Sequence, residues 1–142
     1  MTQKKHIAKT LLSVYPQLDG FIRYQHKFMN ELIKESFHGF TSAEEIISDV
    51  TDRLVKRDQL KFIESMTKKT LRSMPHEQGK ILWSFFIKNK SKDELAAELG
   101  INPRTVYKQI DKALDIFVRV LQRHEMNATV FNQINRALSL VI

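Results

Sequence analysis

In the stretch 91–117, apolar residues recur every three or four positions, as in an α-helix. They do so in two segments that are separated by a short turn. The first apolar face holds Leu95, Ala96 and Leu99. After the turn the same spacing returns, and the expected inner positions are Val106, Ile110, Ala113 or Leu114, and Phe117. The pattern therefore predicts a helix that begins at about residue 92 and a second that begins at about residue 103.

Residues with known preferences for helix ends mark the boundaries of both helices. Ser91 and Glu94 form a capping box at the start of the first helix. Gly100 can take the positive φ that a sharp helix end needs. Asn102 is a good N-cap, and Pro103 is preorganised for the first turn of the next helix. Only Ile101 lies between Gly100 and Asn102, so we expect the two helices to cross rather than lie antiparallel.

The spacing of small and apolar residues in this stretch is typical of a helix-turn-helix. Ala96, Gly100 and Val106 stand at offsets 0, +4 and +10, and the small Ala96 lets the second helix approach closely. A helical hairpin in an ordinary bundle is the alternative, but it needs neither this glycine nor the Asn-Pro cap. The spacing therefore favours DNA binding.

The outer face of the second helix carries the residues that a duplex would meet. Steps of about 100° per residue place Arg104, Lys108, Asp111 and Asp115 outward, with Tyr107 and Lys112 on the flanks. Arg104 and Lys108 lie near the N-terminal end, the end that a recognition helix inserts into the major groove. Arginine can pair with guanine, lysine with guanine or phosphate, and tyrosine with phosphate or a thymine methyl.

The two aspartates on this face are unfavourable beside phosphates. Asp111 either accepts a hydrogen bond from a cytosine amine or pairs with Lys108 or Lys112. We expect Asp111 and Asp115 to be ordinary solvent-exposed residues, and Thr105 to point away from the duplex.

The pattern in the rest of the chain also predicts amphipathic helices. One helix ends before Pro16, and a longer one runs from Gln17 to about Ser36 and ends at the glycine of residues 37–40. A capping box at Thr41 or Ser42 starts a helix that reaches Ser73 or breaks near Asp58. Another opens at residues 76–78, and in it we expect the side chain of Trp83 to be partly buried.

A last amphipathic helix follows the long second helix of the motif, which runs to about His124. Its apolar residues are Val130, Phe131, Ile134, Leu138 and Val141. The very apolar end of the chain packs back on the N-terminal helices or meets a second copy of the chain. We favour self-association, and therefore a homodimer.

Charge concentrates where the motif lies. The net charge is +7, and residues 1–67, 68–124 and 125–142 contribute +1, +6 and 0. A basic excess around the predicted DNA reader suits the release of counterions from a duplex. There is no cysteine, no signal-peptide pattern and no apolar run of about 18 residues. We expect a cytoplasmic protein without membrane contact.

From residue 67 onward the order of these signals, which includes SKDELAAELGINPRTVYKQI, resembles the region-four domain of sigma-70-type transcription factors. The resemblance covers about residues 58–121. The small size and the helical part in front resemble phage and prophage late-gene regulators of the autolysin-regulator (ArpU) type. Residues 1–57 lack the aromatic-basic segment of a complete sigma factor, so the resemblance implies a sigma-like accessory regulator.

The resemblance also implies roles for individual residues. Arg104, Tyr107 and Lys108 occupy base-reading or adjacent positions of the recognition helix. The expected contacts with the DNA backbone are Lys88, Lys90, Ser91 and Lys92, to which we add Asn102 and Lys112. RNA polymerase is a partner that only the family suggests.

Catalysis has little support in the sequence. The five histidines are scattered without metal-ligand spacing, and no glycine-rich phosphate loop occurs. Asp93 and Glu94 belong to a helix start, where negative charge is favoured. We therefore expect no enzyme, no metal and no cofactor.

The sequence thus predicts an all-α protein with three regions. Residues 1–57 form a helical arm for oligomerisation or partner binding, residues 58–124 the helix-turn-helix domain, and residues 125–142 a C-terminal amphipathic helix. The predicted function is a sequence-specific regulator of transcription that binds double-stranded DNA. The alternatives are a small DNA-packaging subunit of a phage and a helix-turn-helix module that binds another protein.

Overall fold

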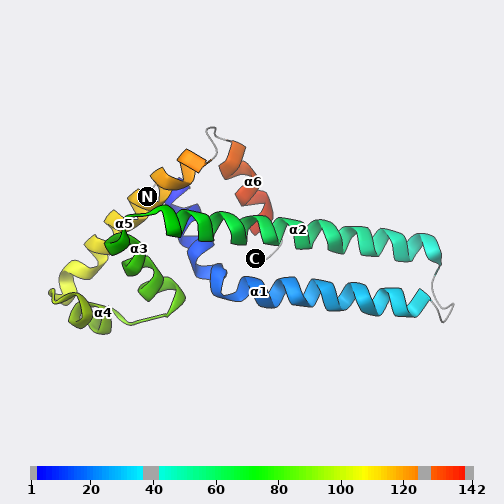
Figure 1. The fold of residues 1–142 in the computed structure, drawn as a ribbon, viewed down its shortest axis with the longest axis horizontal. Helices are drawn as coiled ribbons and strands as arrows, with labels where there is room; N and C mark the ends of the chain where they lie inside the picture. Colours follow the sequence, from blue (N-terminus) through cyan, green and yellow to red (C-terminus); the bar gives the residue numbers. More distant parts are fainter. Residues whose placement is uncertain (1–2, 37–41, 125–128, 140–142) are drawn as a thin grey trace.

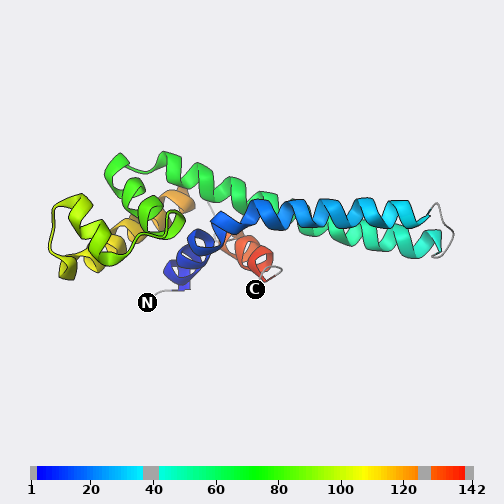
Figure 2. The ribbon, with the colours of Figure 1, turned by 90° about the horizontal axis from the view of Figure 1, so that it is seen from below.

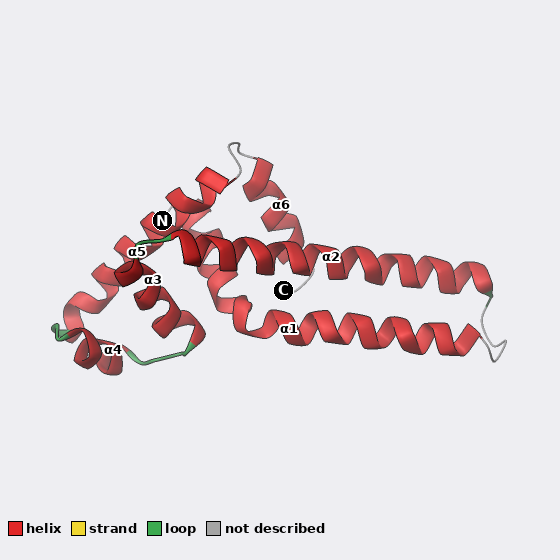
Figure 3. Ribbon diagram, viewed as in Figure 1, coloured by secondary structure: helices red, strands yellow, loops and turns green. Residues whose placement is uncertain are grey.

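The computed structural model describes residues 3–36, 42–124 and 129–139. Within these ranges the chain forms helices α1 (Gln3–Ser36), α2 (Ala43–Ser73), α3 (His76–Leu82), α4 (Lys92–Leu99), α5 (Pro103–His124) and α6 (Thr129–Leu138), with a short π-helix, η1 (Trp83–Ile87), after α3. The described ranges contain no strand, as Figure 3 shows. The predicted all-α class is confirmed.

The shape of the molecule is elongated. The later part of α1 and the first part of α2 run antiparallel as an arm at one end of the long axis, and α4 lies at the other end (Figure 1). The view from below shows the same separation (Figure 2). We use the term "the arm" for residues 17–36 and 43–58.

Helix α1 continues through Pro16, so the predicted helix end before this proline is wrong. A proline inside a helix removes one hydrogen bond and displaces the preceding turn, which bends the helix rather than ending it when both sides pack well. Figures 1 and 2 show that α1 changes direction in its first half. The residues before the proline lie in the common core with Leu11 and Leu12 fully buried, while the later residues lie along α2.

Helix α2 begins at the second of the two predicted capping boxes. The Ser42 side chain accepts a hydrogen bond from the Glu45 N–H at 3.2 Å. The helix then runs unbroken past Asp58 to Ser73, so the predicted alternative of a break is wrong. Buried Thr67 and Thr70 do not interrupt it, because their hydroxyls donate to the carbonyls of Ile63 and Met66, one turn earlier. The predicted glycine end of the preceding helix and the Thr41 cap fall outside the described residues.

One hydrophobic core joins most elements. Phe117 of α5 lies at zero exposure within it. The buried members come from α1, α2, α3, α4, α5 and α6, and among the largest are Leu11, Ile63, Leu82, Leu95, Phe117 and Ile134. The cluster therefore includes residues of all three predicted regions, whose boundaries remain a prediction.

Helix α6 packs against α1 and α2 through Ile134 and Leu138, both of which are buried. This agrees with the amphipathic helix expected there. The side chains of Val130, Phe131 and Val141 fall outside the described residues, as does the apolar end of the chain. The choice between packing back and self-association remains a prediction.

Candidate nucleic-acid interface

Helix α4 starts at the predicted cap. The Ser91 hydroxyl oxygen accepts a hydrogen bond from the Glu94 N–H at 3.2 Å and lies 3.1 Å from the Glu94 carboxylate, to which it donates. The Glu94 N–H is thereby capped by Ser91 as in a capping box, while the Glu94 carboxylate accepts from the Ser91 hydroxyl. Because the Ser91 hydroxyl already has both partners, a phosphate would have to compete with Glu94 for it.

The turn between α4 and α5 has the backbone that its residues predict. Gly100 ends α4 with φ of +67°, in the left-handed region. The N–H of Ile101 donates to the carbonyl of Ala96 at 3.1 Å, which closes the end of α4. The Asn102 side chain then accepts from the Arg104 N–H at 3.0 Å and starts α5.

Helices α4 and α5 pack closely through small and apolar side chains. Ala96 is 2% exposed, and Val106 is fully buried on the facing helix. Of the two alternatives at the next inner turn, both Ala113 and Leu114 are buried. The inner face of α5 is therefore a continuous apolar stripe, which fixes the opposite face toward solvent.

The N-terminal half of that solvent face is open. Arg104, Lys108 and Lys112 are exposed, and Arg119 continues the same side of the helix. These four cations form what we call the basic face of α5. The sequence prediction did not include Arg119, although extending the outer face beyond Asp115 would have found it.

Tyr107 lies beside the basic face and is 58% exposed. The rings of Tyr107 and Phe85 meet edge to face with their centroids 6.5 Å apart. The Lys92 ammonium lies 5.8 Å from the centre of the Tyr107 ring, within the range of a cation–π interaction. These contacts hold the ring at the edge of the face and leave much of it open to a ligand.

The two aspartates of α5 have a partner from far away in the sequence. The ammonium of Lys5 in α1 lies 2.6 Å from a carboxylate oxygen of Asp111 and 3.0 Å from one of Asp115. This pairing raises the pKa of Lys5, chiefly through the hydrogen bond to Asp111 and against the effect of burial. Asp111 and Asp115 are exposed, as the sequence predicted, and the partner of Asp111 is Lys5 instead of the alternatives Lys108 and Lys112.

The contact of Lys5 with α5 could not be predicted, because no sequence signal near Lys5 indicates that α1 lies beside α5. Its side chain is 12% exposed, since the first turns of α1 cross α5 at this point. The consequence for charge is direct. Asp111 and Asp115 are the acidic residues within α5, and one partly buried cation balances part of their charge.

A groove between α1, η1 and α5 runs alongside the basic face. It has a volume of about 510 Å³ and is lined by Lys9, Phe85, Tyr107, Lys108 and Asp111 among others. Lys9 thus joins Tyr107 and Lys108 at the same edge, a contribution that the sequence did not predict. The first turns of α1 border the basic face and leave Arg104, Tyr107 and Lys108 exposed.

The residues expected on the DNA backbone have different surroundings. Lys88 is exposed just after η1, and its N–H donates to the Trp83 carbonyl at 3.0 Å. The Lys90 ammonium hydrogen-bonds Glu98 at 2.5 Å, and this contact is the main reason that the pKa of Glu98 lies below its usual value. A phosphate at Lys90 would therefore compete with a carboxylate.

Other kinds of site find no support in the described ranges. No group of three or more acidic or histidine side chains there is arranged to hold a metal ion. None of the described helices combines the length and the apolar character needed to cross a bilayer.

Comparison with models of known protein families, with curated protein sequences and with solved structures finds no match for this chain.

Proposed function

We propose that this protein is a sequence-specific regulator of transcription that binds double-stranded DNA through the N-terminal half of α5. One observation carries the proposal. Helix α5 begins directly after the turn with Arg104, Tyr107 and Lys108 exposed, while its opposite face is buried. A rigid helix with a basic, open N-terminal end is suited to the major groove.

The proposed roles follow the chemistry of each side chain. Arg104 reads a guanine with two hydrogen bonds, and Lys108 reads a base or meets a phosphate one turn later. Tyr107 contacts a phosphate or a thymine methyl. The DNA backbone on either side is contacted by Lys88, Lys92 and Lys112. It is also contacted by Lys90 and Ser91, which give up their contacts with Glu98 and Glu94 to bind phosphate.

The biological setting of the proposal comes from the resemblance to sigma region four and to autolysin-regulator proteins. On that basis the protein is a cytoplasmic, phage-related or prophage-related accessory factor or activator that contacts RNA polymerase. The arm, which projects away from α4 and α5, is the part available for such a contact (Figure 1).

Selection of bound fragments from the source genome with purified protein tests the proposal. We expect a shared sequence among the fragments and tight binding to it in fluorescence anisotropy. Contact with about six phosphates should weaken binding about a thousandfold between roughly 50 and 200 mM salt. If the protein binds no DNA duplex at low salt concentration, the proposal is wrong.

The same measurements separate the rival functions. A small packaging subunit should form a ring-shaped higher oligomer in light scattering, whereas a regulator should be a monomer or dimer. A module that grips another protein should ignore DNA at every salt concentration.

A further inference from the structure

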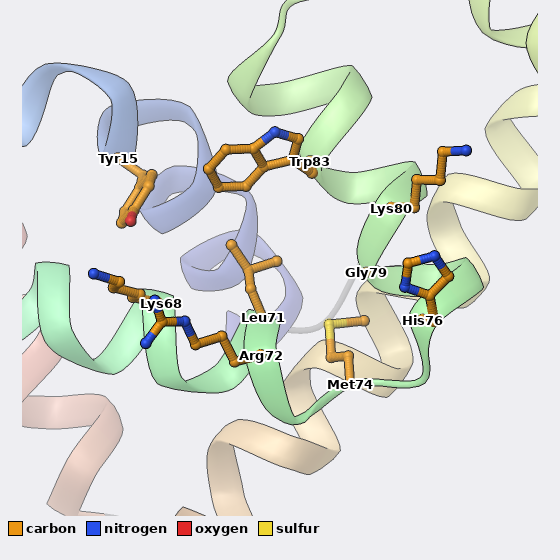
Figure 4. A pocket seen from close by; sticks show the side chains of 9 residues that line it. All are labelled: Tyr15, Lys68, Leu71, Arg72, Met74, His76, Gly79, Lys80 and Trp83. Atoms are coloured by element: carbon orange, nitrogen blue, oxygen red, sulfur yellow. The ribbon is translucent and has the colours of Figure 1, made fainter.

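A second groove lies away from α5, where the elements α1, α2, α3 and η1 meet. Its volume is about 530 Å³, within the range of small-molecule sites. Figure 4 shows Tyr15 and Trp83 along one side, Lys68 and Arg72 along the opposite side, and Leu71 between them. The groove therefore has two aromatic rings facing two cations across an apolar floor.

The aromatic side is held open by contacts within the protein. The rings of Tyr15 and Trp83 meet edge to face with centroids 6.2 Å apart and planes at 62°. Trp83 nevertheless remains 40% exposed, which is high for the largest apolar side chain. It is also the first residue of the π-helix η1, and π-helical turns occur often at functional sites.

The charged side of the groove is cationic. Lys68 and Arg72 lie one turn apart on α2, and His76 and Lys80 of α3 line the other end. Among the described residues that line the groove, none is acidic. Burial, together with a hydrogen bond to Asp19, raises the pKa of the Glu64 carboxyl on the same helix.

We propose that this groove binds a nucleoside monophosphate. The base lies against Trp83 and Tyr15, because a flat ring gains most from offset or edge contact with another aromatic ring. The phosphate lies beside Arg72 and Lys68, because a guanidinium can donate two parallel hydrogen bonds to a phosphate. The proposal does not depend on DNA binding, since the residues of the basic face do not line this groove.

Trp83 provides the readout, since it is the single tryptophan of the chain. Titration with GMP should quench its fluorescence in a saturable way, and calorimetry should give one site per chain. Guanosine lacks the anion and inorganic phosphate lacks the ring, so each should bind at least about tenfold more weakly than GMP.

Variants then place the ligand in the groove. Arg72→Gln should weaken GMP binding about tenfold, and Lys68→Gln should do so independently. Lys61→Gln removes an exposed cation of α2 outside the groove and should leave GMP affinity unchanged. Arg104→Ala should also leave it unchanged, so a failure of GMP binding and a failure of DNA binding are separate results.

The proposal is overturned if GMP causes no saturable quenching, or if guanosine or phosphate binds as tightly as GMP. It is equally overturned if folded Arg72→Gln and Lys68→Gln proteins, checked by their melting curves, bind GMP like the wild type.

Discussion

Lys5 sets the charge of the proposed DNA face although it belongs to another helix. Asp111 and Asp115 lie on the side of α5 that carries Arg104 and Lys108, and their carboxylates would repel phosphates. The Lys5 ammonium contacts both carboxylates. The proposed function therefore depends on a residue that itself need not touch DNA.

Replacing Lys5 with methionine should weaken DNA binding about tenfold, because it leaves two unbalanced carboxylates beside the duplex. Adding Asp111→Asn and Asp115→Asn to this variant should restore the affinity, measured by anisotropy at constant salt. Lys4→Met removes an equal charge from the neighbouring residue and serves as the control. Equal losses for Lys4→Met and Lys5→Met would show that only total charge matters.

Arg104 and Lys112 separate base reading from backbone contact on the same face. Arg104→Ala should cost about 1–3 kcal/mol and relax the preference at one base pair. Lys112→Ala should weaken binding to all duplexes alike and lower the salt slope by about one. Competition between matched and scrambled duplexes measures both. If the two variants give the same pattern, the assigned roles are wrong.

At the scale of elements, the local signals of the sequence were sufficient for α4, α5 and the turn between them. A serine cap, a glycine end and an asparagine cap each act within four residues, so their outcome does not depend on the rest of the fold. Contacts across the molecule could not be inferred in this way. Lys5 meets Asp111, and Tyr15 meets Trp83, only because α1 crosses the later helices.

Gly100 and Gly20 should respond to alanine in opposite directions. Neither position has an atom within 4 Å of an added Cβ, so the backbone decides the result. Gly100 has φ of +67°, and Gly100→Ala should destabilise the protein by about 1 kcal/mol. Gly20 lies within α1, and Gly20→Ala should stabilise it by about 0.5–1 kcal/mol. Urea denaturation measures both, and an unchanged or raised stability of Gly100→Ala would contradict the description of the turn.

The end of α5 should make the stability of the protein depend on pH. Burial, with Lys69 of α2 as a second cause, lowers the pKa of His124 from its usual 6.5. The unfolded chain therefore binds the proton more readily, so stability falls as the pH falls through about 6.5. Between about pH 7.5 and 5.5 the melting temperature should fall further for the wild type than for His124→Gln. An equal decrease in melting temperature for the two proteins would show that the pKa of His124 is the same in the folded and unfolded states.

At the scale of the whole molecule, the arm and the α4–α5 end lie far apart along the long axis (Figure 1). The all-α class and the positions of most helices could be predicted because the apolar period is a property of each segment. The continuity of α1 could not, because Pro16 favours a break locally and packing on both sides overrides it. The shared core, to which α1, α2 and α6 all contribute, is likewise a property of the complete fold.

The proposed homodimer has a consequence for the DNA site. Light scattering should give twice the 16.7 kDa mass of one chain. The selected fragments should contain an inverted repeat whose half-sites are about one helical turn, roughly 34 Å, apart. A single unrepeated site bound by a monomer would contradict the dimer while leaving the role of Arg104 intact.

The bend of α1 decides the direction in which the arm points. One length of this helix belongs to the same core as α5, and the other length follows α2 outward. A straight helix could not do both, and a proline within α1 favours a bend there. The direction of the arm is therefore tied to the course of this one helix.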